Sequence, residues 1–89
     1  MRGGFLNHMD PKLREEKLKM WKDNLVDLEK QLEEISLKKG LAAQEGDLSE
    51  NAAYTMAIED AETTRVRINE VKKIIADLEK GDKNGNTKN

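Results

Sequence analysis

Apolar residues recur at alternating spacings of three and four along two stretches of the chain. The first series is Leu18, Trp21, Leu25, Leu28, Leu32 and Ile35, and the second is Ala57, Ala61, Thr64, Ile68, Val71, Ile75 and Leu78. This spacing is typical of helices that pack against each other along one apolar seam. The pattern therefore predicts an all-α fold made of two long coiled-coil helices.

Local signals set the expected bounds of these helices. Asp10 before Pro11 is typical of a helix N-terminus, so the first helix is expected over about 11–43. A tip at about 44–48 and a second helix over about 49–80 follow, with Gly81 as the expected stop. The hairpin would thus occupy residues 10–81, between a flexible leader (1–9) and a disordered polar tail (82–89).

The two series face each other in antiparallel order. Facing residues have numbers that add to 92 or 93 through six successive layers, from Ile35 with Ala57 to Leu18 with Ile75. This register places the bend near Gly46 and predicts a long antiparallel two-helix hairpin. A parallel homodimer built from the same heptads is the alternative. Five apolar residues also lie off the seam, so a homodimer of hairpins or docking on another protein is a further expectation: Val26, Leu37, Leu41, Val66 and Ile74.

Charge is unevenly placed in a chain whose net charge is −2 and whose residues are 38% charged. Residues 40–64 hold six acids and no Lys or Arg, whereas the rest of the chain has more bases than acids. Such an acidic stretch repels a nucleic-acid backbone, so direct DNA binding is not expected. No apolar run is long enough to span a bilayer and cysteine is absent. We therefore expect a soluble, cytoplasmic protein with no membrane partner.

Two acids, Asp47 and Glu50, lie three residues apart at the expected start of the second helix. One interpretation is structural, with Asp47 as the N-cap and Glu50 as its capping-box partner. The other is chemical, because Mg²⁺ takes one or two protein carboxylates and completes its shell with water or phosphate oxygens. A carboxylate can also do both, so the spacing alone leaves the two interpretations open.

The segment Gly46-Asp47-Leu48-Ser49-Glu50-Asn51-Ala52, followed by Tyr54, resembles the tip signature of the GreA/GreB family of bacterial transcript-cleavage factors. The resemblance extends over the whole hairpin, residues 11–80. It implies a coiled coil that enters the secondary channel of RNA polymerase, where tip acids help to hold a second Mg²⁺ and stimulate cleavage of backtracked RNA. Asp47 and Glu50 would be the donated ligands, with no tightly bound cofactor. Five residues would shape the tip or contact polymerase or the RNA 3′ end: Gly46, Leu48, Ser49, Asn51 and Tyr54.

This sequence departs from the family pattern in two respects. Ala43 stands where the family usually has a basic residue, and Met56 and Ile58 stand where Arg or Lys is frequent. Basic residues remain further from the tip, at Lys38, Lys39 and Arg65. The FKBP-type C-terminal domain of the family is not in this sequence, so we expect either a domain of a longer protein or a short homologue.

Three functions follow from these features. The first is a non-enzymatic factor that stimulates cleavage by RNA polymerase. The second is an inhibitor that occupies the same channel without productive cleavage. The third is a structural coiled-coil adaptor or dimer, in which Asp47 and Glu50 act only as helix caps.

Overall fold

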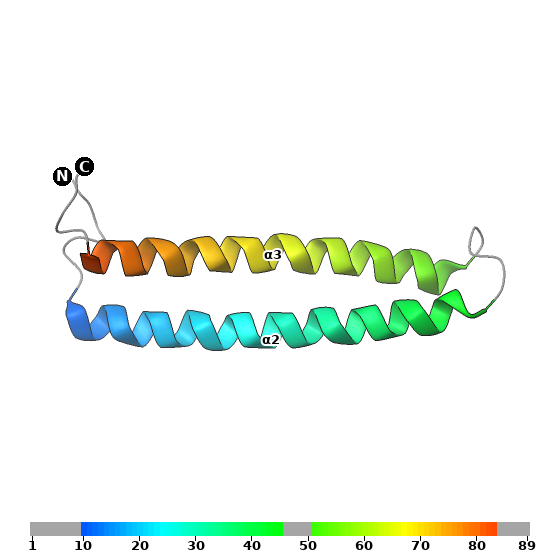
Figure 1. The fold of residues 1–89 in the computed structure, drawn as a ribbon, viewed down its shortest axis with the longest axis horizontal. Helices are drawn as coiled ribbons and strands as arrows, with labels where there is room; N and C mark the ends of the chain where they lie inside the picture. Colours follow the sequence, from blue (N-terminus) through cyan, green and yellow to red (C-terminus); the bar gives the residue numbers. More distant parts are fainter. Residues whose placement is uncertain (1–9, 46–50, 84–89) are drawn as a thin grey trace.

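Two long helices lie side by side and run in opposite directions (Figure 1). The computed structural model describes residues 10–45 and 51–83, and these contain helix α2 (Pro11–Ala43) and helix α3 (Ala52–Lys83). The molecule is a narrow rod with principal extents of 57 × 22 × 15 Å. The predicted all-α antiparallel hairpin is confirmed, and the parallel arrangement is not what the structure shows.

Helix α2 has the bounds that its sequence predicts. The Asp10 side chain accepts a hydrogen bond from the backbone N–H of Leu13 at 3.3 Å, and Pro11 fills the first helical position. The N–H of Arg14 donates to the Asp10 carbonyl at 2.9 Å, which closes the first turn. Asp10 therefore satisfies one of the backbone donors that a helix start leaves unpaired.

Helix α3 differs from its prediction at both ends. It begins at Ala52 rather than near residue 49, and it continues through Gly81 to Lys83. The expected stop at Gly81 is wrong because glycine in a helix costs only about 1 kcal/mol, which neighbouring turns can offset. Asp82 and Lys83 accordingly belong to the helix and not to the polar tail. The predicted leader (1–9), most of the predicted tip (46–50) and residues 84–89 lie outside the described residues.

The core is one apolar seam between the helices. Leu28, Ile68, Val71 and Ile75 form its buried centre, and four partly buried residues pack against them: Leu18, Trp21, Leu25 and Leu32. Every predicted seam residue of α3 is buried, whereas most of those on α2 are only half-buried. A two-helix rod cannot cover large side chains on all sides, so the larger residues of the α2 series keep part of their surface in water.

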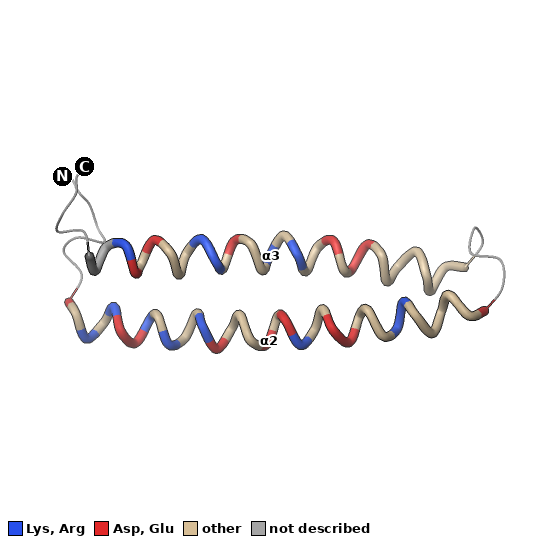
Figure 2. Tube along the Cα trace, viewed as in Figure 1, with Lys and Arg blue, Asp and Glu red and all other residues tan. Residues whose placement is uncertain are grey.

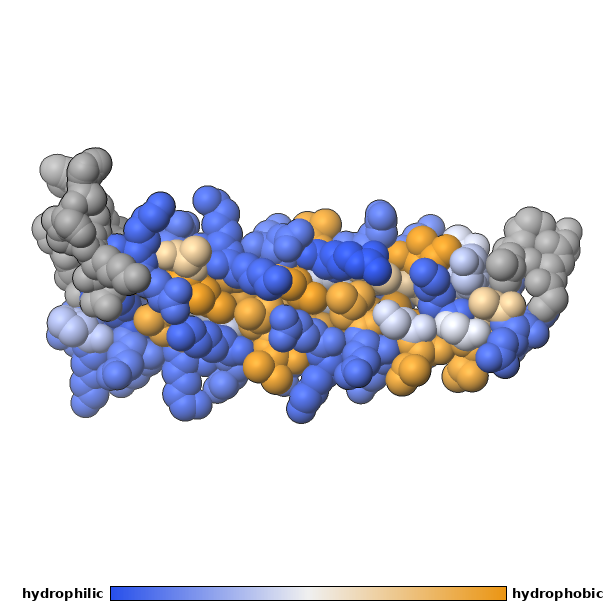
Figure 3. Space-filling model, viewed as in Figure 1, coloured by the Kyte–Doolittle hydropathy of each residue, from blue (hydrophilic) through white to orange (hydrophobic). Residues whose placement is uncertain are grey.

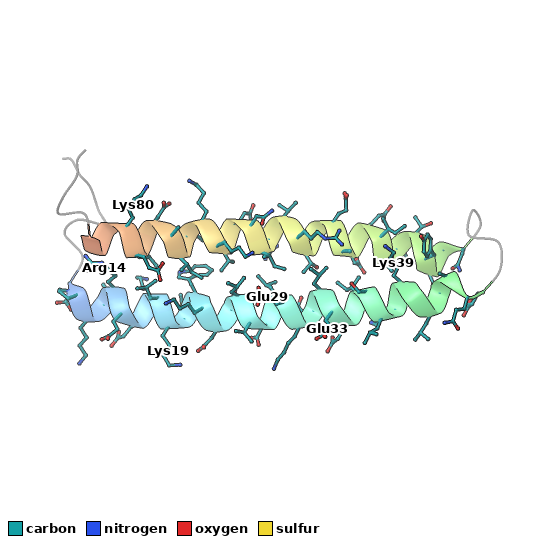
Figure 4. The ribbon with its side chains drawn as sticks, viewed as in Figure 1. Arg14, Lys19, Glu29, Glu33, Lys39 and Lys80 are labelled. Carbon is teal, nitrogen blue, oxygen red and sulfur yellow. The ribbon has the colours of Figure 1, made fainter. Side chains whose placement is uncertain are left out.

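The seam is longer than its apolar residues indicate. Arg14 and Ala42 are buried, and Lys39 and Tyr54 are half-buried, all at positions that continue the three–four spacing outward. Figure 4 shows Arg14 and Lys39 between the helices near the two ends of the rod. Arginine and lysine can pack their aliphatic stems on apolar neighbours while their charged ends reach water.

One ion pair identifies which sides of the two helices adjoin. Lys22 Nζ lies 3.2 Å from Glu79 Oε2, and each residue directly follows a seam residue, Trp21 or Leu78. Both side chains are about half exposed, so the pair contributes little stability. It nevertheless shows that residues following such seam positions share one side of the hairpin.

No helix in the described part of the chain is long and apolar enough to cross a membrane.

Substitution at the centre of the seam tests this packing. Val71 is 2% exposed, so Val71→Ala removes two buried methyl groups and is expected to cost about 2 kcal/mol of unfolding free energy. The matched change Val66→Ala, at a side chain 58% exposed, is expected to stay within about 0.5 kcal/mol. Urea unfolding followed by circular dichroism measures both, and equal losses would contradict the seam.

Candidate functional site at the hairpin tip

Two of the predicted site residues, Asn51 and Tyr54, lie at one end of the rod, at the start of α3. Gly46, Asp47, Leu48, Ser49 and Glu50 lie outside the described residues, so their predicted roles stay predictions. The described framework consists of the end of α2 on one side and Asn51 with the start of α3 on the other. Figure 1 shows both helix ends at the same end of the hairpin.

Asn51 joins the two helices at this end. Its Nδ2 donates to the carbonyl of Ala42 at 2.7 Å, and its Oδ1 accepts from the backbone N–H of Tyr54 at 3.1 Å. Its own carbonyl accepts from the N–H of Thr55 at 3.1 Å, the first bond of α3. The amide thus caps the start of α3 and, with its other half, satisfies a carbonyl at the end of α2. We call this pair of hydrogen bonds the Asn51 clamp.

The position of this cap bears on the structural interpretation of the tip acids. A capping box with Asp47 requires α3 to begin just after residue 47, but α3 begins at Ala52 and is capped by Asn51. The described start of α3 therefore has Asn51, and not Asp47, as its N-cap. Asp47 and Glu50 themselves lie outside the described residues, so the two interpretations of these acids stay open.

The helix dipoles do not account for the acid near the tip that the structure describes. The first turn of α3 holds no acidic residue, although its positive end would favour one. Exposed Glu45 follows the C-terminal end of α2, where a negative charge is unfavourable and where the last turn holds no base. Its N–H donates to the Ala42 carbonyl at 3.1 Å. The carboxylate of Glu45 thus does little to stabilise α2.

Tyr54 is the second predicted site residue that the structure describes. It is half-buried at a position that continues the α3 seam toward the tip, and its backbone N–H serves the Asn51 clamp. Both residues therefore support the tip from within the described hairpin. Contact of Asn51 or Tyr54 with a partner stays a prediction.

Comparison with known families identifies this arrangement. The sequence profile described as "Transcription elongation factor, N-terminal" (GreA/GreB) matches residues 12–79. The match covers well over half of the chain and includes both helices and the tip between them. This chain belongs to the GreA/GreB family. Searches of curated proteins and of solved structures each return no significant match.

The basic residues nearest the tip of this GreA/GreB domain do not gather on one side. Arg65 directly follows seam residue Thr64 and so lies on the side of the Lys22–Glu79 pair. Lys38 directly precedes seam position Lys39, which places it on the opposite side. Lys38 and Arg65 are exposed, whereas Lys39 is half-buried in the seam. An RNA strand that ran along one side of the hairpin would therefore contact either Lys38 or Arg65, but not both.

The carboxylates in the tip sequence are suitable ligands for a hard cation whose coordination shell is completed by groups of another molecule. Within residues 10–45 and 51–83, no three carboxylate, imidazole or thiolate groups come together in a way that could hold a metal ion. Asp47 and Glu50 supply carboxylate oxygens by sequence, and the Asn51 clamp removes the need for either to cap α3. Two carboxylates are the number that Mg²⁺ commonly takes from one protein.

The Asn51 clamp can be separated into its two halves by substitution. Asn51→Ala loses both hydrogen bonds and is expected to cost about 2 kcal/mol, since a cap and a buried hydrogen bond each contribute about 1 kcal/mol. Asn51→Asp keeps the acceptor for Tyr54 but has no donor for Ala42, so about 1 kcal/mol of loss is expected. Exposed Asn69→Ala is the control and should cost nothing. Urea unfolding of the three variants measures these changes in the free energy of unfolding. An Asn51→Asp protein as stable as the unsubstituted chain would show that the hydrogen bond to Ala42 contributes nothing to stability.

Proposed function

We propose that this domain acts on bacterial RNA polymerase, entering the secondary channel tip-first and stimulating the polymerase's own cleavage of backtracked RNA. The domain would work in the cytoplasm, where bacterial transcription takes place. It contributes ligands to an active site that the polymerase already has, and it is not an enzyme by itself.

The family match across both helices supports this proposal most strongly. The hairpin geometry adds a physical reason. A helix of 33 residues extends about 50 Å at 1.5 Å per residue, so the rod can carry its tip far from any surface that holds its base. Its width of 22 × 15 Å is little more than that of two packed helices. A long, narrow rod suits a deep channel.

Asp47 and Glu50 are the residues that would hold Mg²⁺ together with groups of the polymerase. When bound, the ion supplies positive charge for hydrolysis of a phosphodiester, as in two-metal sites. The Asn51 clamp supports this proposal, because it joins the two helix ends that precede and follow the segment with these two residues. Gly46, Leu48 and Ser49 complete the tip, and Lys38 or Arg65 would approach the RNA 3′ end.

A second candidate function is occupation of the channel without productive cleavage. The observation that favours it is the exposed apolar surface where the resemblance leads us to expect bases. Met56 is 61% exposed and Ile58 39% exposed, and Ala43 at the end of α2 is also exposed. With Lys38 and Arg65 on different sides, the domain has few cations with which to hold an RNA strand. Such a protein would compete with cleavage factors.

Cleavage of RNA in a stalled, backtracked elongation complex with Mg²⁺ tests the proposal. The unsubstituted chain is expected to shorten the RNA, and Asp47→Ala or Glu50→Ala is expected to lower the rate at least about tenfold, as loss of a metal ligand does. Exposed Glu62→Ala is the matched control, because it removes one carboxylate from the same acidic stretch and should keep the rate within about twofold.

The same experiment separates the other functions. Blocked elongation without shortening of the RNA would support the inhibitor. No binding to polymerase at all would contradict both polymerase functions and leave the structural adaptor. Circular dichroism of the Asp47→Ala and Glu50→Ala proteins checks that the helices persist.

A further inference from the structure

The part of the hairpin directly behind the tip carries no charge. Residues 40–44 at the end of α2 and 51–58 at the start of α3 include no Asp, Glu, Lys or Arg, in a chain that is 38% charged. Figure 2 shows this stretch in tan on both helices, next to the tip. We call these two segments, with exposed Leu37 one turn before them, the collar.

Large apolar side chains of the collar face water. Leu37, Leu41 and Met56 are 66%, 64% and 61% exposed, the three highest values among the exposed large apolar residues of the described chain. Figure 3 shows apolar atoms along the outer edge of α2 toward the tip. Exposed apolar side chains that gather in one region of a charged surface are typical of an interaction site.

Two of these side chains lie on the same side of the hairpin. Leu41 and Met56 each directly precede a buried seam residue, Ala42 and Ala57. Lys22 and Glu79 each directly follow one and meet on the other side. Because successive helical residues are separated by about 100°, residues before and after a seam position point to opposite sides. Leu37 lies one turn from Leu41, in the same row of α2.

Acidic residues flank the collar toward the base of the rod and toward the tip. Glu45 lies on the tip side, and exposed Glu34, Glu59 and Asp60 lie toward the base of the rod. Exposed Lys38 is a base on the same side as Leu41, because it too directly precedes a seam position. Two copies that met through their collars would bring together four acids but only one of these bases from each copy, and an excess of like charges at an interface is costly. A complementary partner instead has an apolar centre bordered by Lys or Arg.

We propose that the collar is a docking surface for such an apolar, base-bordered wall of the polymerase channel. The inference rests on the proposed function and deepens it by assigning two tasks to different residues. The collar supplies affinity through apolar contact, and the acids beyond it supply metal ligands. Apolar contact would hold the rod in the channel independently of Lys38 and Arg65, the exposed cations nearest the tip.

Two triple variants of the whole chain test this proposal. The collar variant is Leu37→Gln/Leu41→Gln/Met56→Gln, and the matched control is Met20→Gln/Val26→Gln/Val66→Gln. All six side chains are between 49% and 66% exposed, and glutamine is a good helix former, so both proteins should fold. Circular dichroism and urea unfolding check this before binding is measured.

Binding of each protein to a bacterial RNA polymerase elongation complex is then measured. The collar variant is expected to bind about tenfold more weakly or worse, because three apolar contacts are lost. The control should bind within about twofold of the unsubstituted chain. Equal binding by the collar and control variants would overturn the docking surface while leaving the proposed function intact.

Two other outcomes would also count against the inference. If the unsubstituted chain fails to bind polymerase, the proposed function fails and the docking surface with it. If sedimentation shows that the chain alone is a dimer and that only the collar variant is a monomer, the collar is occupied by a second copy.

Discussion

The seam between α2 and α3 is the interaction on which the rest of the structure depends. Its buried centre, around Leu28, Ile68, Val71 and Ile75, holds two helices that neither capping nor surface ion pairs could keep together. Because both helices are long and pair from base to tip, the seam converts a sequence of 89 residues into a rod 57 Å long. Apolar packing in the middle of the molecule thereby decides where the acidic segment lies.

The Asn51 clamp is the second constraint, because it caps the start of α3 and joins it to the end of α2. An amide is suited to this position because it offers a donor to Ala42 and an acceptor to Tyr54 at the same time. A carboxylate could serve only the second bond. Asn51 provides the cap of α3, and a role of Asp47 and Glu50 toward a partner stays a prediction, because both lie outside the described residues.

Much of the fold follows from the spacing of apolar residues, but the ends of the seam do not. The heptad series predicted both helices and their antiparallel pairing, and Asp10-Pro11 predicted the start of α2. The apolar series ends at Leu18 and Ile35 because the next positions hold charged residues, Arg14 and Lys39, yet Arg14 is buried and Lys39 is half-buried in the seam. Extending the three–four spacing without regard to polarity would have found Arg14, Lys39, Ala42 and Tyr54.

Helix-cap and helix-stop signals predicted the bounds of α3 less well, because more than one residue near each end could cap or end the helix. Asp47 and Asn51 are both good caps, and only the other helix, through the Ala42 carbonyl, decides between them. Gly81 is a common stop but lies beyond Leu78, where the buried seam can still hold the helix. The tip motif indicated a family and a chemistry, and the apolar spacing placed Leu37 and Leu41 off the seam, where the structure finds them exposed. The spacing did not predict that Met56 would be exposed near them.

The antiparallel pairing is tested most directly by cross-linking, since the chain has no cysteine of its own. Lys22→Cys with Glu79→Cys replaces an ion pair of 3.2 Å and, with a short bis-maleimide, should give an internal cross-link in a monomer. Lys22→Cys with Arg65→Cys moves the second thiol 14 residues along the same side, about 21 Å at 1.5 Å per residue, and should not. Covalent dimers from the first pair, or equal internal cross-linking by both, would contradict the hairpin described above.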